Sequence, residues 1–314
     1  MEPRHRDALP QLGDEPFLTD GGIETTLTFH QGLELPELAA FDLLKDDAGV
    51  AELRRYFDPY LELARSEGAG FILETPTWRA SPRWASAIGY DEAQLDGLNR
   101  QAVELMEELR AASEAEAGTM VISGCVGPQD DAYDPARMLS PEEAGSYHST
   151  QISTFADTSA DLVTAITMTH AEEAIGIARA AGAAGMPVAI SFTLETDGTL
   201  PSGQPLAEAI DQVDADPDSE VAYHMINCAH PTHFDDLVAG EGPWRERIRG
   251  LRANASTKSH EELDEASELD DGDPEDLGAR YAELRASLPA LNVLGGCCGT
   301  DARHVSAIWS AWTA

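Results

Sequence analysis

Leu291-Asn292-Val293-Leu294-Gly295-Gly296-Cys297-Cys298-Gly299-Thr300, close to the end of the chain, is the stretch that decides the fold. It opens on a short, mostly apolar run followed by glycines, which is the pattern of a buried strand that ends in a turn. Successive residues of a regular strand point to opposite faces, so two adjacent thiols share one focus only where the strand has given way to a loop. The flanking glycines permit that change because they carry no Cβ.

A third thiol stands in the same context. The run Tyr223-His224-Met225-Ile226-Asn227-Cys228 is apolar and also ends on a cysteine. Three thiols at two strand ends predict one metal site, with Cys228, Cys297 and Cys298 as its ligands. Sulfur ligands favour zinc, copper(I) or an iron–sulfur cluster, and the spacing matches no ferredoxin pattern. Three thiolates around zinc with an open fourth position are typical of a catalytic site.

Other candidate ligands fit this pattern less well. Cys125, in Ser123-Gly124-Cys125-Val126-Gly127, is either a fourth ligand or a small buried residue beside a loop, and the second interpretation is favoured. His224 lies in an apolar run and is expected in the core with a hydrogen-bond partner. Loop or surface positions are expected for three further histidines, namely His230, His233 and His304.

Eight short apolar runs alternate with helical stretches along the chain. The strand candidates are residues 17–22, 70–75, 119–124, 160–166, 187–192, 223–227, 248–253 and 292–294. Apolar residues at helical spacing occupy residues 50–64, 95–112 and 172–181. Eight strand–helix repeats in 314 residues predict an α/β fold, a single (β/α)8 TIM barrel over residues 1–314, rather than an open sheet.

Polar or special residues gather just after the predicted strands. They are Asp20, Glu74, Cys125, Cys228, Cys297 and Cys298. In a barrel the carboxyl ends of the strands meet at one rim, where active sites are built. The sequence therefore predicts an enzyme with its metal site at the C-terminal rim of the strands.

Two acidic segments look like insertions, residues 211–220 and 256–278. The second carries ten acidic residues and little apolar content between its ends, and it follows the seventh strand. We expect an acidic rim insert over 256–278, solvated and mobile, with a lid over the rim as the alternative.

The charge balance is strongly acidic, with 57 acidic against 20 basic residues, a formal net charge of −37 and a pI near 4.3. Nucleic acid and anionic membrane surfaces would be repelled, so neither is an expected partner. An acidic surface that attracts ligands is one interpretation, and adaptation to high salt is the favoured one because salt screens self-repulsion. No apolar stretch is long enough to span a membrane and no signal peptide is visible, which predicts a cytoplasmic protein. Four cysteines do not make a disulfide framework.

The charge of the predicted centre indicates its chemistry. Zinc with three thiolates carries a net charge of −1, which makes it a poor activator of water but a good holder of another thiol, and it deprotonates a coordinating thiol. A free thiol, with a pKa of about 8.5, is only a few per cent ionised at neutral pH. The site therefore suits the presentation of a substrate thiolate as a nucleophile.

Three motifs together resemble those of the homocysteine S-methyltransferases: Gly295-Gly296-Cys297-Cys298-Gly299-Thr300, Ile226-Asn227-Cys228 and Asp20-Gly21-Gly22-Ile23-Glu24-Thr25. The resemblance covers roughly residues 17–309. It implies a (β/α)8 barrel whose zinc is held by Cys228, Cys297 and Cys298. It also implies that homocysteine fills the fourth position and attacks the methyl group of a sulfonium or quaternary ammonium donor, giving methionine. Of the possible donors, S-methylmethionine or S-adenosylmethionine is favoured over betaine.

The resemblance also implies roles for the first motif, with Asp20 holding the substrate ammonium and the amides of Gly21 and Gly22 binding its carboxylate. The family often has a second amine-binding Glu at the end of the fourth strand. Here Thr164-Ala165-Ile166-Thr167-Met168 places Ile166 at that position, which leaves the acceptor thiol open. Glu74 and Glu195, at neighbouring strand ends, are the candidates to replace the missing carboxylate.

Two further motif residues have expected structural roles. Asn227 is expected to orient Cys228 or to contact the substrate. The pair Glu24 and Thr25 is expected to cap the segment that follows rather than to act in catalysis.

The favoured interpretation is thus a zinc-dependent thiol S-methyltransferase, whose partners are a small-molecule thiol and a methyl donor. The alternatives are methyl transfer to a thiol other than homocysteine, a redox protein using the vicinal dithiol of Cys297 and Cys298, and a zinc-binding barrel without catalysis. The oligomeric state is left open by the sequence.

Overall fold

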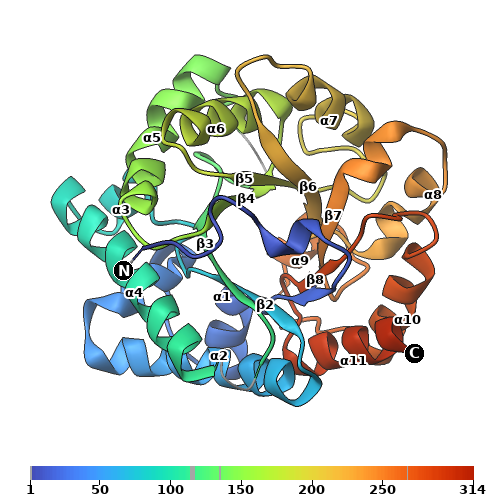
Figure 1. The fold of residues 1–314 in the computed structure, drawn as a ribbon, viewed down its shortest axis with the longest axis horizontal. Helices are drawn as coiled ribbons and strands as arrows, with labels where there is room; N and C mark the ends of the chain where they lie inside the picture. Colours follow the sequence, from blue (N-terminus) through green and yellow to red (C-terminus); the bar gives the residue numbers. More distant parts are fainter. Residues whose placement is uncertain (1, 114–116, 134–135, 267) are drawn as a thin grey trace.

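The computed structural model describes residues 2–113, 117–133, 136–266 and 268–314. Eight parallel strands follow one another in chain order and close into a barrel, because β1 pairs with both β2 and β8 (Figure 1). The strands are β1 (Phe17–Leu18), β2 (Gly70–Glu74), β3 (Met120–Val126), β4 (Leu162–Met168), β5 (Val188–Phe192), β6 (Val221–Asn227), β7 (Ile248–Ala253) and β8 (Val293–Gly296). The predicted (β/α)8 barrel is confirmed.

Helices follow the strands along the chain, and most of them surround the barrel on the outside (Figure 1). They are α1 (Ile23–Thr25), α2 (Asp47–Glu67), α3 (Pro82–Ala87), α4 (Glu92–Ser113), α5 (Pro141–Ala156), α6 (Ala171–Ala183), α7 (Leu206–Asp214), α8 (Asp235–Val238), α9 (His260–Asp264), α10 (Pro274–Leu284) and α11 (Ala302–Thr313). Local signals set several of their ends. The side chain of Asp46 accepts a hydrogen bond from the Gly49 amide at the start of α2, and Gly68, with φ +63°, ends that helix.

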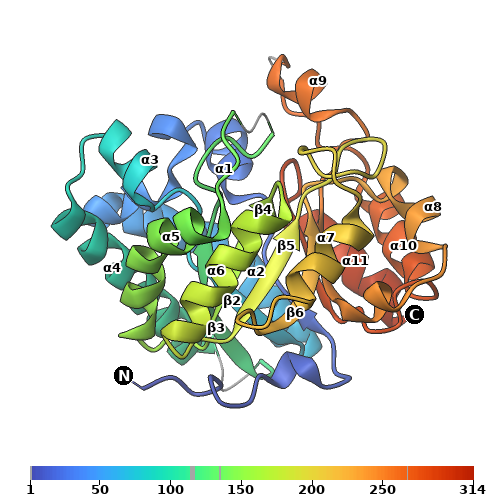
Figure 2. The ribbon, with the colours of Figure 1, turned by 90° about the horizontal axis from the view of Figure 1, so that it is seen from above.

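The strands are buried on both faces, which explains their continuous apolar runs. Every residue of β3, β4 and β5 is buried. Inside the barrel one apolar cluster joins side chains from the strands to Leu9 of the N-terminal segment: Leu9, Phe17, Ile72, Val121, Leu162, Ala189, Tyr223, Met225 and Val293. Figure 2 shows this segment crossing the mouth of the barrel opposite α9, so the amino ends of the strands are covered and the other rim carries the loops.

The observed elements correct several predicted boundaries. β1 has only two residues, and β3 runs to Val126, so Cys125 lies within a strand rather than after it. The acidic segment 211–220 begins with the last turn of α7. Segment 256–278 contains α9 and the start of α10, so less of it is loop than predicted; its residue 267 lies outside the described residues. None of the helices in the described parts of the chain has the length and hydropathy needed to cross a membrane.

Candidate metal centre

The three predicted ligands lie together at the C-terminal rim. Cys228 follows β6, and Cys297 and Cys298 follow β8. Their sulfur atoms all lie within 4.8 Å of one another, and the Sγ atoms of Cys228 and Cys298 are 3.4 Å apart. Sulfur ligands around a tetrahedral zinc, at Zn–S distances of about 2.3 Å, are separated by about 3.8 Å. The three thiols are therefore close enough together to hold one zinc ion.

One of the three cysteines has an unusual backbone conformation. Cys228 has φ +54°, a left-handed conformation that is uncommon outside glycine. The end of β7 fixes both cysteine segments, because the amide of Cys228 donates to the carbonyl of Arg252 and that of Cys297 to the carbonyl of Ala253. Backbone strain held by surrounding hydrogen bonds is characteristic of functional sites.

The thiols affect one another's protonation. Hydrogen bonds from Cys297 and Cys298 hold the pKa of Cys228 well below its ordinary value. The same interactions with Cys228 raise the pKa of Cys298 well above the ordinary value, and raise that of Cys297 to about 12. Of the three thiols, Cys228 is thus the one that loses its proton most readily. Three thiolates at this spacing require a cation among them.

Asn227 connects the strand ends below the cysteines. Its fully buried side chain accepts hydrogen bonds from the Thr167 amide at 2.9 Å and the Ser191 hydroxyl at 2.6 Å. Its amide group donates to the Thr167 hydroxyl at 3.0 Å. Asn227 therefore joins β4, β5 and β6 directly beside Cys228. These contacts support the expected orienting role, and Asn227 is not among the residues that line the pocket.

Two aromatic residues that the sequence gave no reason to single out cover Cys228. The hydroxyl of Tyr133 donates to the Cys228 sulfur at 3.1 Å, and its ring lies 4.3 Å from the ring of His260 on α9. His260 is 2.8 Å from the Cys228 carbonyl through Nε2 and 3.2 Å from Glu195 through Nδ1. Glu195, one candidate for the missing amine-binding carboxylate, is therefore paired with α9 and does not line the pocket.

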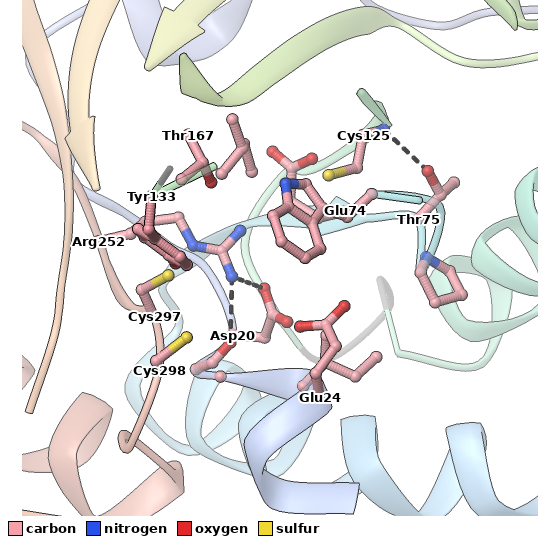
Figure 3. Close-up of a pocket in the computed structure, with 16 residues that line it drawn as sticks. Asp20, Glu24, Glu74, Thr75, Cys125, Tyr133, Thr167, Arg252, Cys297 and Cys298 are labelled. Carbon is pink, nitrogen blue, oxygen red and sulfur yellow. Dashed lines mark hydrogen bonds and ion pairs between the residues drawn. The ribbon is translucent and has the colours of Figure 1, made fainter. Parts of the chain in front are cut away.

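One pocket opens beside the cysteines (Figure 3). The lining residues are Asp20, Gly21, Gly22, Ile23, Glu24, Glu74, Thr75, Pro76, Trp78, Cys125, Tyr133, Ile166, Thr167, Arg252, Cys297 and Cys298. Figure 3 shows Cys297 and Cys298 on one side and Glu74, Thr75 and Cys125 on the other, with Arg252 and Asp20 between.

Asp20 has protein partners on both of its carboxylate oxygens. Arg252 approaches one oxygen to 2.7 Å, and the Tyr56 hydroxyl donates to the other at 2.8 Å. Arg252 also donates to the carbonyls of Gly21 at 3.1 Å and Gly296 at 3.0 Å, so it ties the β1 loop to the end of β8. Burial raises the pKa of Asp20, and the nearby Arg252 charge opposes that rise. Asp20, the expected partner of a substrate ammonium, is thus already paired with Arg252. In the sequence, Arg252 is only one polar residue within a weakly predicted strand.

The two glycines after Asp20 allow the cysteine loop to pack closely. A Cβ on Gly22 would lie 2.4 Å from the Cys297 carbonyl oxygen, and one on Gly21 would lie 2.7 Å from the Thr300 carbonyl oxygen. The Gly22 amide donates to the Thr300 carbonyl at 3.0 Å. The expectation that this amide binds a carboxylate therefore does not fit the structure. Gly21 and Gly22 still line the pocket, and close approach accounts for both glycines.

Glu24 and Glu74 both line the pocket. Burial raises the pKa of each carboxyl group to about 7. The expected capping role of Glu24 is wrong, because Gly22 begins α1 and no side chain caps it. Thr25 instead connects segments: its hydroxyl donates to the Gly22 carbonyl and accepts from the Gly299 amide.

The remaining candidates lie outside the sulfur cluster. Cys125 is buried in the pocket wall, where its amide donates to the Thr75 hydroxyl at 2.9 Å. His224 is a fully buried core residue 2.9 Å from Asp214, as predicted. His230 lies in a loop, one of its two expected positions, although it is buried and hydrogen-bonded. His233 is half-buried in a short 3₁₀ helix (Pro231–His233). The expectation is wrong for His304, which is buried within α11.

Comparisons with known proteins place the chain in a family. The sequence profile of the homocysteine S-methyltransferase family matches residues 17–312. The chain therefore belongs to that family, which is a family of methyltransferases. No curated protein sequence matched.

Two solved structures of the homocysteine methyltransferase MmuM from Escherichia coli share the fold. The oxidized form has a TM-score of 0.71 at 22% identity, covering 97% of this chain and 98% of that one. The metallated form has a TM-score of 0.69 at 22% identity, covering 96% and 98%.

Proposed function

We propose that this chain transfers a methyl group from a small sulfonium-type donor to a thiol, with homocysteine as the acceptor and methionine as the product. The observation that carries the proposal is the convergence of Cys228, Cys297 and Cys298 within 4.8 Å at the rim of the barrel. Zinc, when bound there, would supply the positive charge that keeps an incoming thiol deprotonated and reactive. Family membership supports the same chemistry.

The protein's own residues supply positioning. Asn227 and the end of β7 fix the cysteine backbones, and Arg252 holds the β1 loop against the end of β8. Tyr133 donates to the Cys228 sulfur and covers it. Holding two reactants in line contributes more to a displacement of this kind than acid–base groups do. The acidic pocket also favours a cationic donor over a neutral or anionic one.

The test is a donor and acceptor screen of the zinc-loaded protein in high salt, read by mass spectrometry of the methylated thiol. S-methylmethionine, S-adenosylmethionine and betaine are the donors. We expect about one zinc per chain and methionine from homocysteine. Cys298→Ser should lose zinc and activity together, whereas Cys125→Ser, a thiol of the same pocket outside the cluster, should keep its zinc. Full methyl transfer by a metal-free preparation would refute the proposal.

A further inference from the structure

The pocket holds more carboxyl groups than the metal centre uses. Asp20, Glu24 and Glu74 line it, and Arg252 is the one lysine or arginine among the lining residues. Arg252 makes its ion pair with Asp20. The wall opposite the cysteines therefore has acidic groups that lack a paired cation.

Asp20 helps to hold the β1 loop against the end of β8. Both of its oxygens accept hydrogen bonds, and the Arg252 that binds it also donates to Gly21 and Gly296. A carboxylate and a guanidinium at 2.7 Å have no net charge between them. Such a pair attracts an incoming ammonium far less than a single carboxylate does. Asp20 is therefore a positioning residue here.

The end of β4 offers no charge either. Ile166 lines the pocket and is 7% exposed. An aliphatic side chain can pack against the methylene groups of an acceptor but cannot bind its ammonium. Of the two groups expected to bind the amine, Asp20 is therefore already paired with Arg252, and the second carboxylate is replaced by Ile166.

Glu74 is placed to act instead. It is the last residue of β2, it lines the same pocket, and it is 6% exposed. Its Oε2 atom is buried and has no hydrogen-bond partner among the residues that the structure describes. A buried polar atom without a partner costs free energy, which is recovered when a ligand donates to it. Burial raises the pKa of this carboxyl group to about 7, although the charge of Arg252, which is paired with Asp20, and the hydroxyls of Ser123 and Thr164 oppose that rise.

We propose that Glu74 binds the α-ammonium group of the thiol acceptor, in place of Asp20 and of the residue at position 166. The inference rests on the proposed function and deepens it, because it identifies the residue that selects an α-amino thiol. The thiol end of the acceptor lies at the cysteines on β6 and β8, and its amine points across the pocket to β2.

The experiment compares homocysteine with 4-mercaptobutanoate, which has the same chain and carboxylate but no amino group. Binding of both thiols to the full-length, zinc-loaded protein is measured by calorimetry in molar KCl, and KM and kcat are measured separately. A charge-assisted hydrogen bond of this kind corresponds to a preference for homocysteine of about 10- to 100-fold. Glu74→Gln, which keeps the shape and removes the charge, should abolish the preference by weakening homocysteine binding and raising its KM. Binding of 4-mercaptobutanoate should stay unchanged.

Two further variants separate the role of Glu74 from a general effect on the pocket. Glu24→Gln removes the other unpaired carboxylate and should leave the preference intact. Ile166→Glu in the Glu74→Gln background should restore it. Should Glu74→Gln fail to fold, Glu74→Asp, which retracts the charge by one methylene, is expected to reduce the preference about tenfold.

The outcomes distinguish the two proposals. Equal binding of both thiols to the unmodified protein, or a preference that survives in Glu74→Gln, overturns the role of Glu74 while thiol methylation stands. A preference lost in Glu24→Gln but kept in Glu74→Gln also overturns it. Failure of both thiols to bind the zinc-loaded protein overturns the proposed function itself, and the role of Glu74 with it.

Discussion

Several single residues at the rim are in states that a bound ligand or metal would make more favourable. Cys228 has a left-handed backbone, Glu74 has a buried oxygen without a partner, and three thiols lie within 4.8 Å of one another. The first two features cost stability in the chain without a ligand. Each also lies where the proposed chemistry needs it, so the measurable consequences are changes in stability as well as in activity.

Glu74 should give the protein a measurable pH dependence of stability. Its folded pKa of about 7 lies above the ordinary value of 4.5, so the folded state binds a proton that the unfolded state releases. The free energy of unfolding should therefore be highest below pH 4.5 as far as Glu74 is concerned, and should fall as the pH rises through 7. A shift of this size corresponds to about 3 kcal/mol.

Denaturant unfolding of Glu74→Gln and the unmodified protein at pH 5 and pH 8 tests this. The variant should be more stable than the unmodified chain at pH 8 by roughly 1–3 kcal/mol and similar to it at pH 5. The titratable groups that interact with Glu74 are Arg252, Asp20, Cys125 and Tyr223, and both proteins retain all four. Glu104→Gln, on the exposed face of α4, is the control and should show no such difference. An equal difference at both pH values would contradict the prediction.

Removal of the metal should expose the cysteines to oxidation. The sulfurs of Cys228 and Cys298 are 3.4 Å apart in the structure. Treatment of the chelated protein with hydrogen peroxide should oxidise these two thiols to one disulfide, with the peroxide reduced to water, and the chain should lose about two mass units. Peptide mapping should find Cys228 joined to Cys298. A Cys297–Cys298 link in its place would contradict this expectation and support vicinal-dithiol chemistry.

At the scale of elements, the end of a strand could be predicted where an apolar run in the sequence gives way abruptly to polar residues, glycine or cysteine. The run before Cys228 ends at Asn227, as predicted, whereas the strand before Cys297 continues through the two glycines to Gly296, two residues beyond its predicted end at Leu294. Contacts between distant loops could not be predicted. Nothing near Arg252 in the sequence identifies Asp20 as its partner, since the two are 232 positions apart. Tyr133 and His260 meet only because α9 lies over the cysteines.

The β1 loop packs so closely against the cysteine loop that a larger side chain in the first should displace the second. A Cβ at position 22 would lie 2.4 Å from the Cys297 carbonyl oxygen. Gly22→Ala should therefore displace the cysteine loop and weaken zinc binding at least tenfold, measured by competition with a chelator. Gly97→Ala is the matched control. It lies within α4 with no heavy atom within 4 Å of its added Cβ, and it should raise the free energy of unfolding by about 0.5–1 kcal/mol. Unchanged zinc affinity in Gly22→Ala would contradict the prediction.

The acidic segment 256–278 is attached to the cysteine cluster through α9. His260 contacts the Cys228 carbonyl, Glu195 and the ring of Tyr133. We expect His260→Ala to free α9, so that hydrogen exchange of residues 260–264 accelerates about tenfold while the melting temperature changes little. Glu195→Gln should show a smaller acceleration that is not additive with His260→Ala, because both act through one contact. Unchanged exchange would show that other contacts hold α9.

At the scale of the whole molecule, the surface is strongly acidic whereas the core of the barrel is apolar. The core is apolar, and the strands and their topology follow rules that do not depend on net charge. The 57 acidic residues exceed the 20 basic ones so far that most surface carboxylates have no cation to pair with. Their mutual repulsion destabilises the compact state and must be screened by the solvent. The fold could thus be predicted from pattern alone, whereas its stability depends on the medium.

The melting temperature should therefore rise with salt. Screening lengths fall from about 10 Å at 0.1 M salt to about 3 Å at 1 M, so repulsion among exposed carboxylates weakens steeply over that range. We expect the melting temperature to rise by on the order of 10 °C between 0.1 M and 2 M KCl, as for a gain of a few kcal/mol in a chain of this size. Sucrose at the same osmolality is the control, because it is excluded from the protein surface but does not screen charge. It should raise the melting temperature less than KCl does. Replacing the exposed Glu261, Glu265 and Glu268 with Gln should reduce the salt dependence, because fewer charges remain to be screened. A melting temperature that is the same in dilute buffer and in molar salt would show that the acidic surface is not a salt adaptation, and would leave attraction of cationic ligands as its explanation.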